Sequence, residues 1–315
     1  MPDVTRRRAV AAGLAVVLAA IGTTDVAVPT DERGAELGGL ERVRARPCIA
    51  IIGASASAGF GVFVEGPGGD GPGIVDLRLR DLLEAVVEPC PVTFSDWSTA
   101  MFFRDPIDVG RESVERAMAV EPAAVLAIDY LFWFAYGSHD AEGRPIREES
   151  QREALFEIGL ANLDRLSAPI LVGDLPNAKG ASTRILSERQ IPAPETLARL
   201  NARLEAFAAE RPRIRVLRLS EEMRRAKELD AARPPPAVGD DGTPVPSIRR
   251  PRLQRDRMHP TFDGLVEITR ASLLAMREVP AIGTLATEVD DVELEDLRSR
   301  IQSRVLNGSA AGVAP

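Results

Sequence analysis

Residues 48–59 read CIAIIGASASAG, an apolar run that leads into a loop of small residues. The run is bounded by Pro47 and Gly53, so we expect it to form a buried strand. Small residues let the chain turn sharply and let a substrate carbonyl approach the backbone. Ser55 in this loop is therefore a candidate nucleophile, with its own N–H directed at a developing oxyanion. Two other interpretations stay open, a plain tight turn and a phosphate cradle at a helix N-terminus, and the serine offset is not that of a G-x-S-x-G elbow.

A base for such a serine is offered by residues 256–261, which read DRMHPT. The chain has only two histidines, and His259 follows Asp256 by three residues. At this spacing the carboxylate can accept from Nδ1–H and fix the tautomer, which leaves Nε2 free to take the serine proton. A single pair of this kind is more often a helix cap at the surface. Its occurrence together with the serine loop predicts a catalytic triad of Ser55, His259 and Asp256.

Apolar runs alternate with helical patterns along most of the chain. We expect strands at 48–53, 92–95, 123–129, 170–173 and 214–217, and helices near 77–86, 111–120, 146–167, 194–210 and 262–277. Because parallel strands need helix-sized crossovers, this order predicts an α/β fold with a doubly wound, five-stranded parallel sheet and helices on both faces. Ligand sites in such sheets lie beyond the carboxyl ends of the strands. The Gly- and Pro-rich segments 61–73 and 231–246 are expected to be irregular loops.

The N-terminus is expected to lie outside this domain. Residues 5–8 read TRRR and precede an apolar stretch from Ala9 to Ile21, as in a signal peptide, and the paired arginines fit a twin-arginine signal. The predicted divisions are a signal peptide or N-terminal anchor at 1–27, a linker at 28–46, the folded domain at 47–280, and a C-terminal helix and flexible tail at 281–315. We therefore expect an exported protein, periplasmic or extracellular, with attachment to the membrane by an uncleaved signal as the alternative.

Composition limits the partners. A net charge of −8 with a pI of about 5.1 argues against binding of nucleic acid. No His/Cys cluster has the spacing of metal ligands, and no cofactor is expected. Cys48 and Cys90 each open one of two neighbouring expected strands, which is compatible with a disulfide in an oxidising compartment or with two buried free thiols.

The two quoted segments resemble known blocks of one family. Residues 53–59 resemble the first block of the GDSL-like, SGNH-type hydrolases, with Ala54 where the family usually has aspartate, and residues 256–261 resemble the last block. The resemblance covers roughly residues 47 to 278 and implies a flavodoxin-like sheet. It also implies that Ser55 is the nucleophile, His259 the general base and acid, and Asp256 its orienting carboxylate.

The middle of the chain departs from the family pattern. The family usually has a glycine after the second strand, but residues 96–100 read DWSTA, so Ser98 and Ala100 are the candidate backbone donors to an oxyanion. The family's oxyanion asparagine is also missing, because residues 128–134 read IDYLFWF. Asp129 and Tyr130 are placed at the site, and Asp129 would repel an oxyanion unless it is protonated or turned away. Loss of one oxyanion donor typically costs about a hundredfold to a thousandfold in rate, so we expect a slow enzyme, a different donor or an altered substrate.

These features predict an exported serine hydrolase that cleaves an ester or O-acyl bond of a small-molecule, glycan or lipid substrate through an acyl-enzyme. A polysaccharide O-acetyltransferase with the same triad, and a degenerate domain that binds glycan or lipid without turnover, are the alternatives. Most of the rings in the aromatic run 130–136 are expected in the core, with one or two at the site. His139 is expected on a surface loop.

Overall fold

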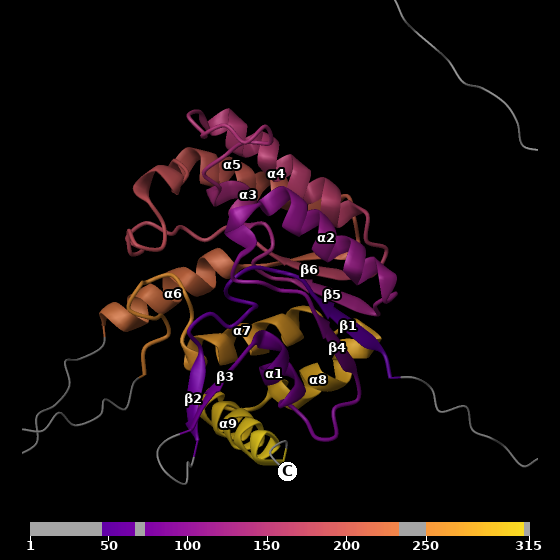
Figure 1. The fold of residues 1–315 in the computed structure, drawn as a ribbon. Helices are drawn as coiled ribbons and strands as arrows, with labels where there is room; N and C mark the ends of the chain where they lie inside the picture. Colours follow the sequence, from indigo (N-terminus) through magenta and orange to yellow (C-terminus); the bar gives the residue numbers. More distant parts are fainter. Residues whose placement is uncertain (1–45, 67–72, 233–249, 312–315) are drawn as a thin grey trace, which may run out of the picture. The chain divides into compact units, whose positions relative to one another are not determined.

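The computed structural model describes residues 46–66, 73–232 and 250–311, and a five-stranded sheet forms its centre (Figure 1). The strands are β1 (Cys48–Ile51), β4 (Thr93–Asp96), β5 (Ala124–Ala127), β6 (Ile170–Gly173) and β7 (Ile214–Leu217). They lie in the order β4-β1-β5-β6-β7, and every neighbouring pair is parallel. The chain therefore leaves β1 toward one edge and returns to its other side, which opens a crevice at the carboxyl end of β1. The predicted fold class is confirmed.

Helices cover both faces of this sheet (Figure 1). One layer holds α2 (Pro106–Ala119), α3 (Phe132–Tyr136), α4 (Glu149–Asp164) and α5 (Pro194–Ala209), and the other holds α1 (Leu79–Glu84), α7 (Phe262–Ala275), α8 (Pro280–Asp290) and α9 (Leu294–Ala311). Short 3₁₀ turns lie at Phe102–Arg104 and Glu188–Gln190. Successive side chains of a strand point to opposite faces. Ala50 and Ile52 accordingly join the core beneath the first layer, while Ile49 and Ile51 join the core beneath the second.

The start of α7 fixes the position of the segment that carries His259. The side chain of Thr261 caps this helix and accepts a hydrogen bond from the N–H of Gly264 at 3.3 Å. The Thr261 hydroxyl also donates to the carbonyl of Pro251 at 2.6 Å. The turn before the helix is thus tied both to the helix and to the incoming chain, so the imidazole is held by local structure.

Two elements were not expected from the sequence. A hairpin of β2 (Phe63–Gly66) and β3 (Gly73–Asp76) begins within the segment 61–73 that was predicted to be an irregular loop, and α6 (Leu219–Ala231) follows β7 directly. Val64 pairs with Val75 in the hairpin, and Val64 is buried. The hairpin was not predicted because its short alternation of apolar and polar residues lies among many glycines. Most of the second predicted loop, residues 233–246 of 231–246, lies outside the described residues.

The C-terminal segment differs from its prediction. The single expected helix is two helices, α8 and α9, separated at residues 291–293. Val289, Leu297 and Ile301 have no exposed surface and belong to the core beneath α1 and α7. These helices are therefore part of the domain, and the boundary expected at residue 280 does not separate them from it.

Of the two alternatives left open for Cys48 and Cys90, the disulfide is not formed. Cys48 and Cys90 are both free and half-buried. The strand partner of Cys48 is Thr93, where β4 begins, so Cys90 lies three residues before the paired register. The thiol of Cys48 instead donates to the hydroxyl of Ser95 at 3.4 Å. Free thiols were the alternative expectation, although they are less buried than expected.

No helix in the described part of the chain is long and apolar enough to cross a membrane. The segment predicted to be a signal peptide or anchor, and nearly all of the linker, fall at residues 1–45 and lie outside the described residues.

Candidate active site

The loop that carries Ser55 follows the carboxyl end of β1. It is closed by backbone hydrogen bonds from the N–H of Ala58 to the carbonyl of Ala54 and from the N–H of Phe60 to the carbonyl of Ser55, both at 2.9 Å. Gly59 has a φ of +70°, and a Cβ there would lie 1.6 Å from the carbonyl oxygen of Leu77. Only glycine fits this turn, because other residues strain at positive φ and have no room for a Cβ. The sharp turn expected from the small residues is present.

The structure brings Ser55, His259 and Asp256 together. Nε2 of His259 lies 2.9 Å from Oγ of Ser55, and Nδ1 lies 2.7 Å from Oδ2 of Asp256. Both Ser55 and His259 are buried. With a proton on Nδ1, the ring donates to the carboxylate and accepts the serine hydroxyl at Nε2, which is the arrangement of a nucleophile, base and orienting acid.

The loop around Asp256 is organised for this contact. Oδ1 of Asp256 accepts hydrogen bonds from the N–H groups of Met258 and His259, each at 3.0 Å, while Oδ2 faces the imidazole. Arg257, which follows Asp256 in the chain, has a φ of +60°. This left-handed conformation is rare for residues other than glycine. Burial by itself would raise the pKa of Asp256, but the hydrogen bonds from the His259 ring and the two N–H groups together hold that pKa below its usual value. The carboxylate is therefore ionised beside the imidazole at neutral pH.

Asp129 is turned toward the backbone of the nucleophile loop. Oδ1 accepts from the N–H of Ala54 at 2.9 Å and from the hydroxyl of Ser57 at 2.6 Å, and Oδ2 accepts from the N–H of Ala56 at 2.7 Å and of Ser57 at 3.3 Å. A Cβ on residue Gly53 would lie 2.3 Å from Oδ1, so the glycine makes room for the carboxylate. Asp129 thus clamps the loop from the end of β5. Asp129 is at the site, as expected from the sequence, but its contacts with the loop were not expected.

Of the two candidate oxyanion donors after β4, one N–H is already engaged within the described residues and the other is not. The N–H of Ser98 donates to Oδ1 of Asp96 at 2.8 Å, so it is already engaged. The N–H of Thr99 donates to the carbonyl of Gly53 at 2.9 Å, which places this turn beside the nucleophile loop. Within residues 46–66, 73–232 and 250–311, the N–H groups of Ser55 and Ala100 have no acceptor. Ala100 therefore remains as a donor candidate and Ser98 does not.

Tyr130 does not line the site. It has no exposed surface and packs edge-on against Phe102, with its ring 5.4 Å from that of Phe134. Burial raises the pKa of its hydroxyl well above its usual value. The placement of Tyr130 at the site is therefore corrected, because the chain enters α3 here and turns this ring into the core. Phe132 is the ring of this run that reaches the cavity.

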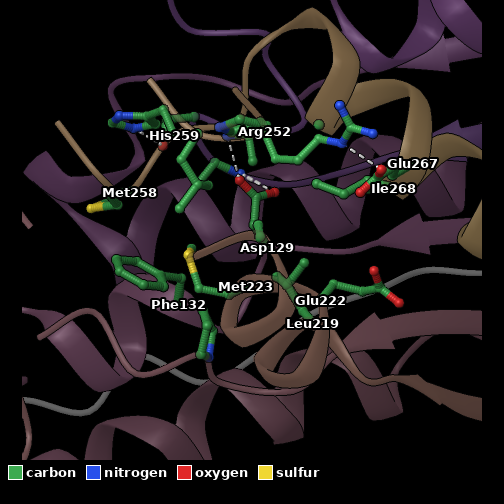
Figure 2. Close-up of a pocket in the computed structure, with 18 residues that line it drawn as sticks. Asp129, Phe132, Leu219, Glu222, Met223, Arg252, Met258, His259, Glu267 and Ile268 are labelled. Carbon is green, nitrogen blue, oxygen red and sulfur yellow. Dashed lines mark hydrogen bonds and ion pairs between the residues drawn. The ribbon is translucent and has the colours of Figure 1, made fainter. Parts of the chain in front are cut away.

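A small apolar cavity of about 60 Å³ opens beside Ser55 and His259 (Figure 2). Its apolar wall comes from α3, α6, α7 and the segment before α7, and includes Phe132, Leu219, Met223, Ala226, Met258 and Ile268. Four charged residues, Asp129, Glu222, Arg252 and Glu267, also line it, and Arg252 pairs with Glu267 at 2.5 Å. Burial raises the pKa of Glu222.

The α6 residues were missed by sequence analysis because α6 itself was not expected. Leu219, Met223 and Ala226 follow one another at spacings of four and three, which places them on one helix face. That spacing was a readable signal within an otherwise charged stretch. Asp174, at the end of β6, holds the start of this helix by accepting from the N–H and hydroxyl of Ser220, both at 2.6 Å.

The other histidine lies away from the site. His139 is exposed on the loop after α3, as expected, and its Nδ1 lies 2.9 Å from the hydroxyl of Ser138. Among the described residues there is no group of three or more His, Cys, Asp or Glu side chains that could hold a metal ion.

Comparison with known proteins gives distant similarities only. No family model and no curated protein matches the chain. Among solved structures, a catalytic mutant of Axe2, an acetylxylan esterase from Geobacillus stearothermophilus, is 15% identical over 75% of this chain and 95% of its own, with a TM-score of 0.46. LAE5, an alpha/beta hydrolase enzyme from the metagenome of Lake Arreo, is 14% identical over 76% of this chain and 97% of its own, with a TM-score of 0.44. TesA is 14% identical over 74% and 99%, with a TM-score of 0.42.

Similarity at this level does not assign an activity. The functional assignment below is therefore drawn from the side chains around Ser55.

Proposed function

We propose that this protein is a serine hydrolase of the SGNH type that cleaves an ester or O-acyl bond through an acyl-enzyme on Ser55. The observation that supports it best is the continuous relay from Ser55 Oγ through His259 to Asp256, at 2.9 and 2.7 Å. A buried serine within hydrogen-bond reach of an oriented imidazole is the arrangement that activates a hydroxyl as a nucleophile.

The reaction would proceed in two halves. Oγ of Ser55 attacks the carbonyl carbon while Nε2 of His259 takes the hydroxyl proton, and the carbonyl electron pair moves onto oxygen. Collapse of this intermediate breaks the bond to the leaving alcohol, which takes the proton from Nε2. Water then attacks the acyl-enzyme, again with His259 as base, and releases the carboxylic acid and Ser55. Asp256 stabilises the imidazolium in both halves.

The oxyanion would be met by backbone groups. The N–H groups of Ser55 and Ala100 are the candidates, because Ser98 donates to Asp96 and Asp129 is an acceptor for the loop. Without a side-chain donor, the rate should be reduced by about a hundredfold or more against an enzyme that has one.

Labelling by a fluorophosphonate probe tests the proposal. Wild type should be labelled on Ser55 and should hydrolyse p-nitrophenyl acetate, and Ser55→Ala should do neither. Ser138→Ala is the matched control, because it removes an exposed serine on the loop after α3, away from the relay, and it should keep the label. Absence of label and of turnover in folded wild type would overturn the assignment and would favour a domain that binds glycan or lipid without turnover.

Hydrolysis and acyl transfer share this chemistry up to the acyl-enzyme. Transfer of an acetyl group to a polysaccharide acceptor, as in an O-acetyltransferase, is distinguished from release to water by following labelled acetyl in the presence of a glycan. Export is a separate proposal, supported by the basic and apolar residues 5–21. Cell fractionation and N-terminal sequencing of the product test export and distinguish a cleaved signal from a retained anchor.

A further inference from the structure

The cavity beside Ser55 is small and lined mainly by apolar side chains. We infer that it receives the acyl group of the substrate and restricts the enzyme to short, uncharged acyl chains of about two to four carbons. This inference rests on the proposed function and adds the substrate class. It is carried by the size, the lining and the position of the cavity.

The size sets the limit on chain length. The cavity has about 60 Å³, whereas an engineered apolar cavity that binds benzene has roughly 150 Å³. It therefore has room for only a few carbon atoms. Phe132, Met258 and Ala226, all nearly fully buried, form part of its wall, so a longer chain would have to displace packed side chains.

The lining sets the chemistry. Apart from four charged residues, the side chains that line the cavity are mostly apolar, so methyl and methylene groups gain by leaving water there. Three of the charged residues, Asp129, Glu222 and Glu267, are acidic, and Nε of the one lining arginine, Arg252, already meets Glu267. Carboxylates therefore outnumber cations in the described lining by three to one. An acyl chain that ends in a carboxylate, such as a succinyl group, is therefore disfavoured.

The position distinguishes the acyl group from the alcohol. The acyl group stays attached to Ser55 between the two half-reactions, whereas the alcohol must depart and water must enter beside His259. Phe60 lies on the imidazole, with ring centroids 4.7 Å apart, and is 44% exposed, so the ring of His259 has a neighbour at the open surface. The apolar cavity suits the group that remains, and the exposed side at Phe60 suits the group that exchanges with water.

The test compares acyl chain length at constant leaving group. Wild type should hydrolyse p-nitrophenyl acetate and butyrate and should lose at least tenfold in kcat/KM by the octanoate, with all activity abolished in Ser55→Ala. Met223→Ala, which lengthens the cavity along α6, should raise the ratio of hexanoate to acetate by about fourfold for each extra methylene that it admits. Ala226→Leu fills the cavity and should shift the ratio toward acetate.

A matched variant and a second series make the result decisive. Met118→Ala makes the same truncation on the exposed face of α2, away from the cavity, and should leave the ratio unchanged. In a second series, acetate esters of alcohols of increasing length should respond little to Met223→Ala. Equal Ser55-dependent hydrolysis of acetate and octanoate, or a Met223→Ala effect confined to the alcohol series, would overturn the inference and leave the proposed function standing. Absence of Ser55-dependent hydrolysis of every ester would overturn both.

Discussion

Replacement of Asp129 by asparagine separates two explanations of this site. The family pattern has an asparagine donor after this strand, so Asp129→Asn would restore an oxyanion donor and raise activity if the side chain faced the substrate. In the structure the carboxylate instead accepts four hydrogen bonds from the nucleophile loop, two at each oxygen. We therefore predict that Asp129→Asn lowers activity.

The magnitude follows from the donors that lose their acceptor. An asparagine amide can accept through one atom only, so its NH₂ group must face at least one backbone N–H, that of Ala54 or that of Ala56. Hydrogen bonds to a charged group contribute roughly 1.5–3 kcal/mol each, so we expect the free energy of unfolding to fall by about 2–4 kcal/mol. A displacement of the Ser55 hydroxyl by about 1 Å would lower kcat about a hundredfold.

Two measurements on the same protein check this prediction. Urea denaturation gives the change in unfolding free energy, and hydrolysis of p-nitrophenyl acetate per labelled active site gives kcat. Asp140→Asn is the matched control, because Asp140 is also buried and accepts hydrogen bonds from Arg144 and Gln151 on a loop that does not line the active-site cavity. It should lose stability while its kcat per folded molecule stays near wild type. A kcat/KM for Asp129→Asn equal to or above wild type would refute the clamp.

Three further predictions concern the rest of the site. Because the folded pKa of Asp256 is lowered, its carboxylate stabilises the fold above the unfolded pKa, about 3.9, and this contribution disappears as pH falls through the folded pKa. The unfolding free energies of wild type and Asp256→Asn should therefore differ at pH 7 and converge in acid. A difference that stays constant with pH would contradict this. Gly59→Ala should lower the unfolding free energy by more than about 1 kcal/mol, because φ at residue 59 is positive and the Cβ of the alanine would meet the carbonyl of Leu77. An unchanged midpoint of urea denaturation would contradict this prediction. Phe60→Ala should lower kcat/KM by about two- to tenfold through loss of the ring contact on His259, worth roughly 0.5–1.5 kcal/mol, and a variant as active as wild type would show that the contact is not needed.

Local patterns in the sequence predicted the elements that depend on short-range rules. Residues 170–173 and 214–217 form strands with the expected bounds, because a buried parallel strand is a short, continuous apolar run. The alternation of such runs with helices also fixed the class of sheet, since parallel neighbours require crossovers. The Asp256–His259 contact was predictable for the same reason, as both partners lie within one turn of chain.

The sequence alone determined the fold class and the residues of the relay, because each depends on spacing along the chain or on the edge where parallel strands end. Tertiary structure decided which groups meet across long separations. Whether Asp129 faced the substrate or the loop depended on the space left by Gly53, 76 residues earlier, and on three N–H groups that no sequence pattern orients. The acyl-sized cavity likewise exists only because α6, beyond the last strand, packs toward the nucleophile loop, which lies more than 150 residues before it. Such contacts are set by packing and by the need to satisfy buried donors, and these are properties of the assembled fold.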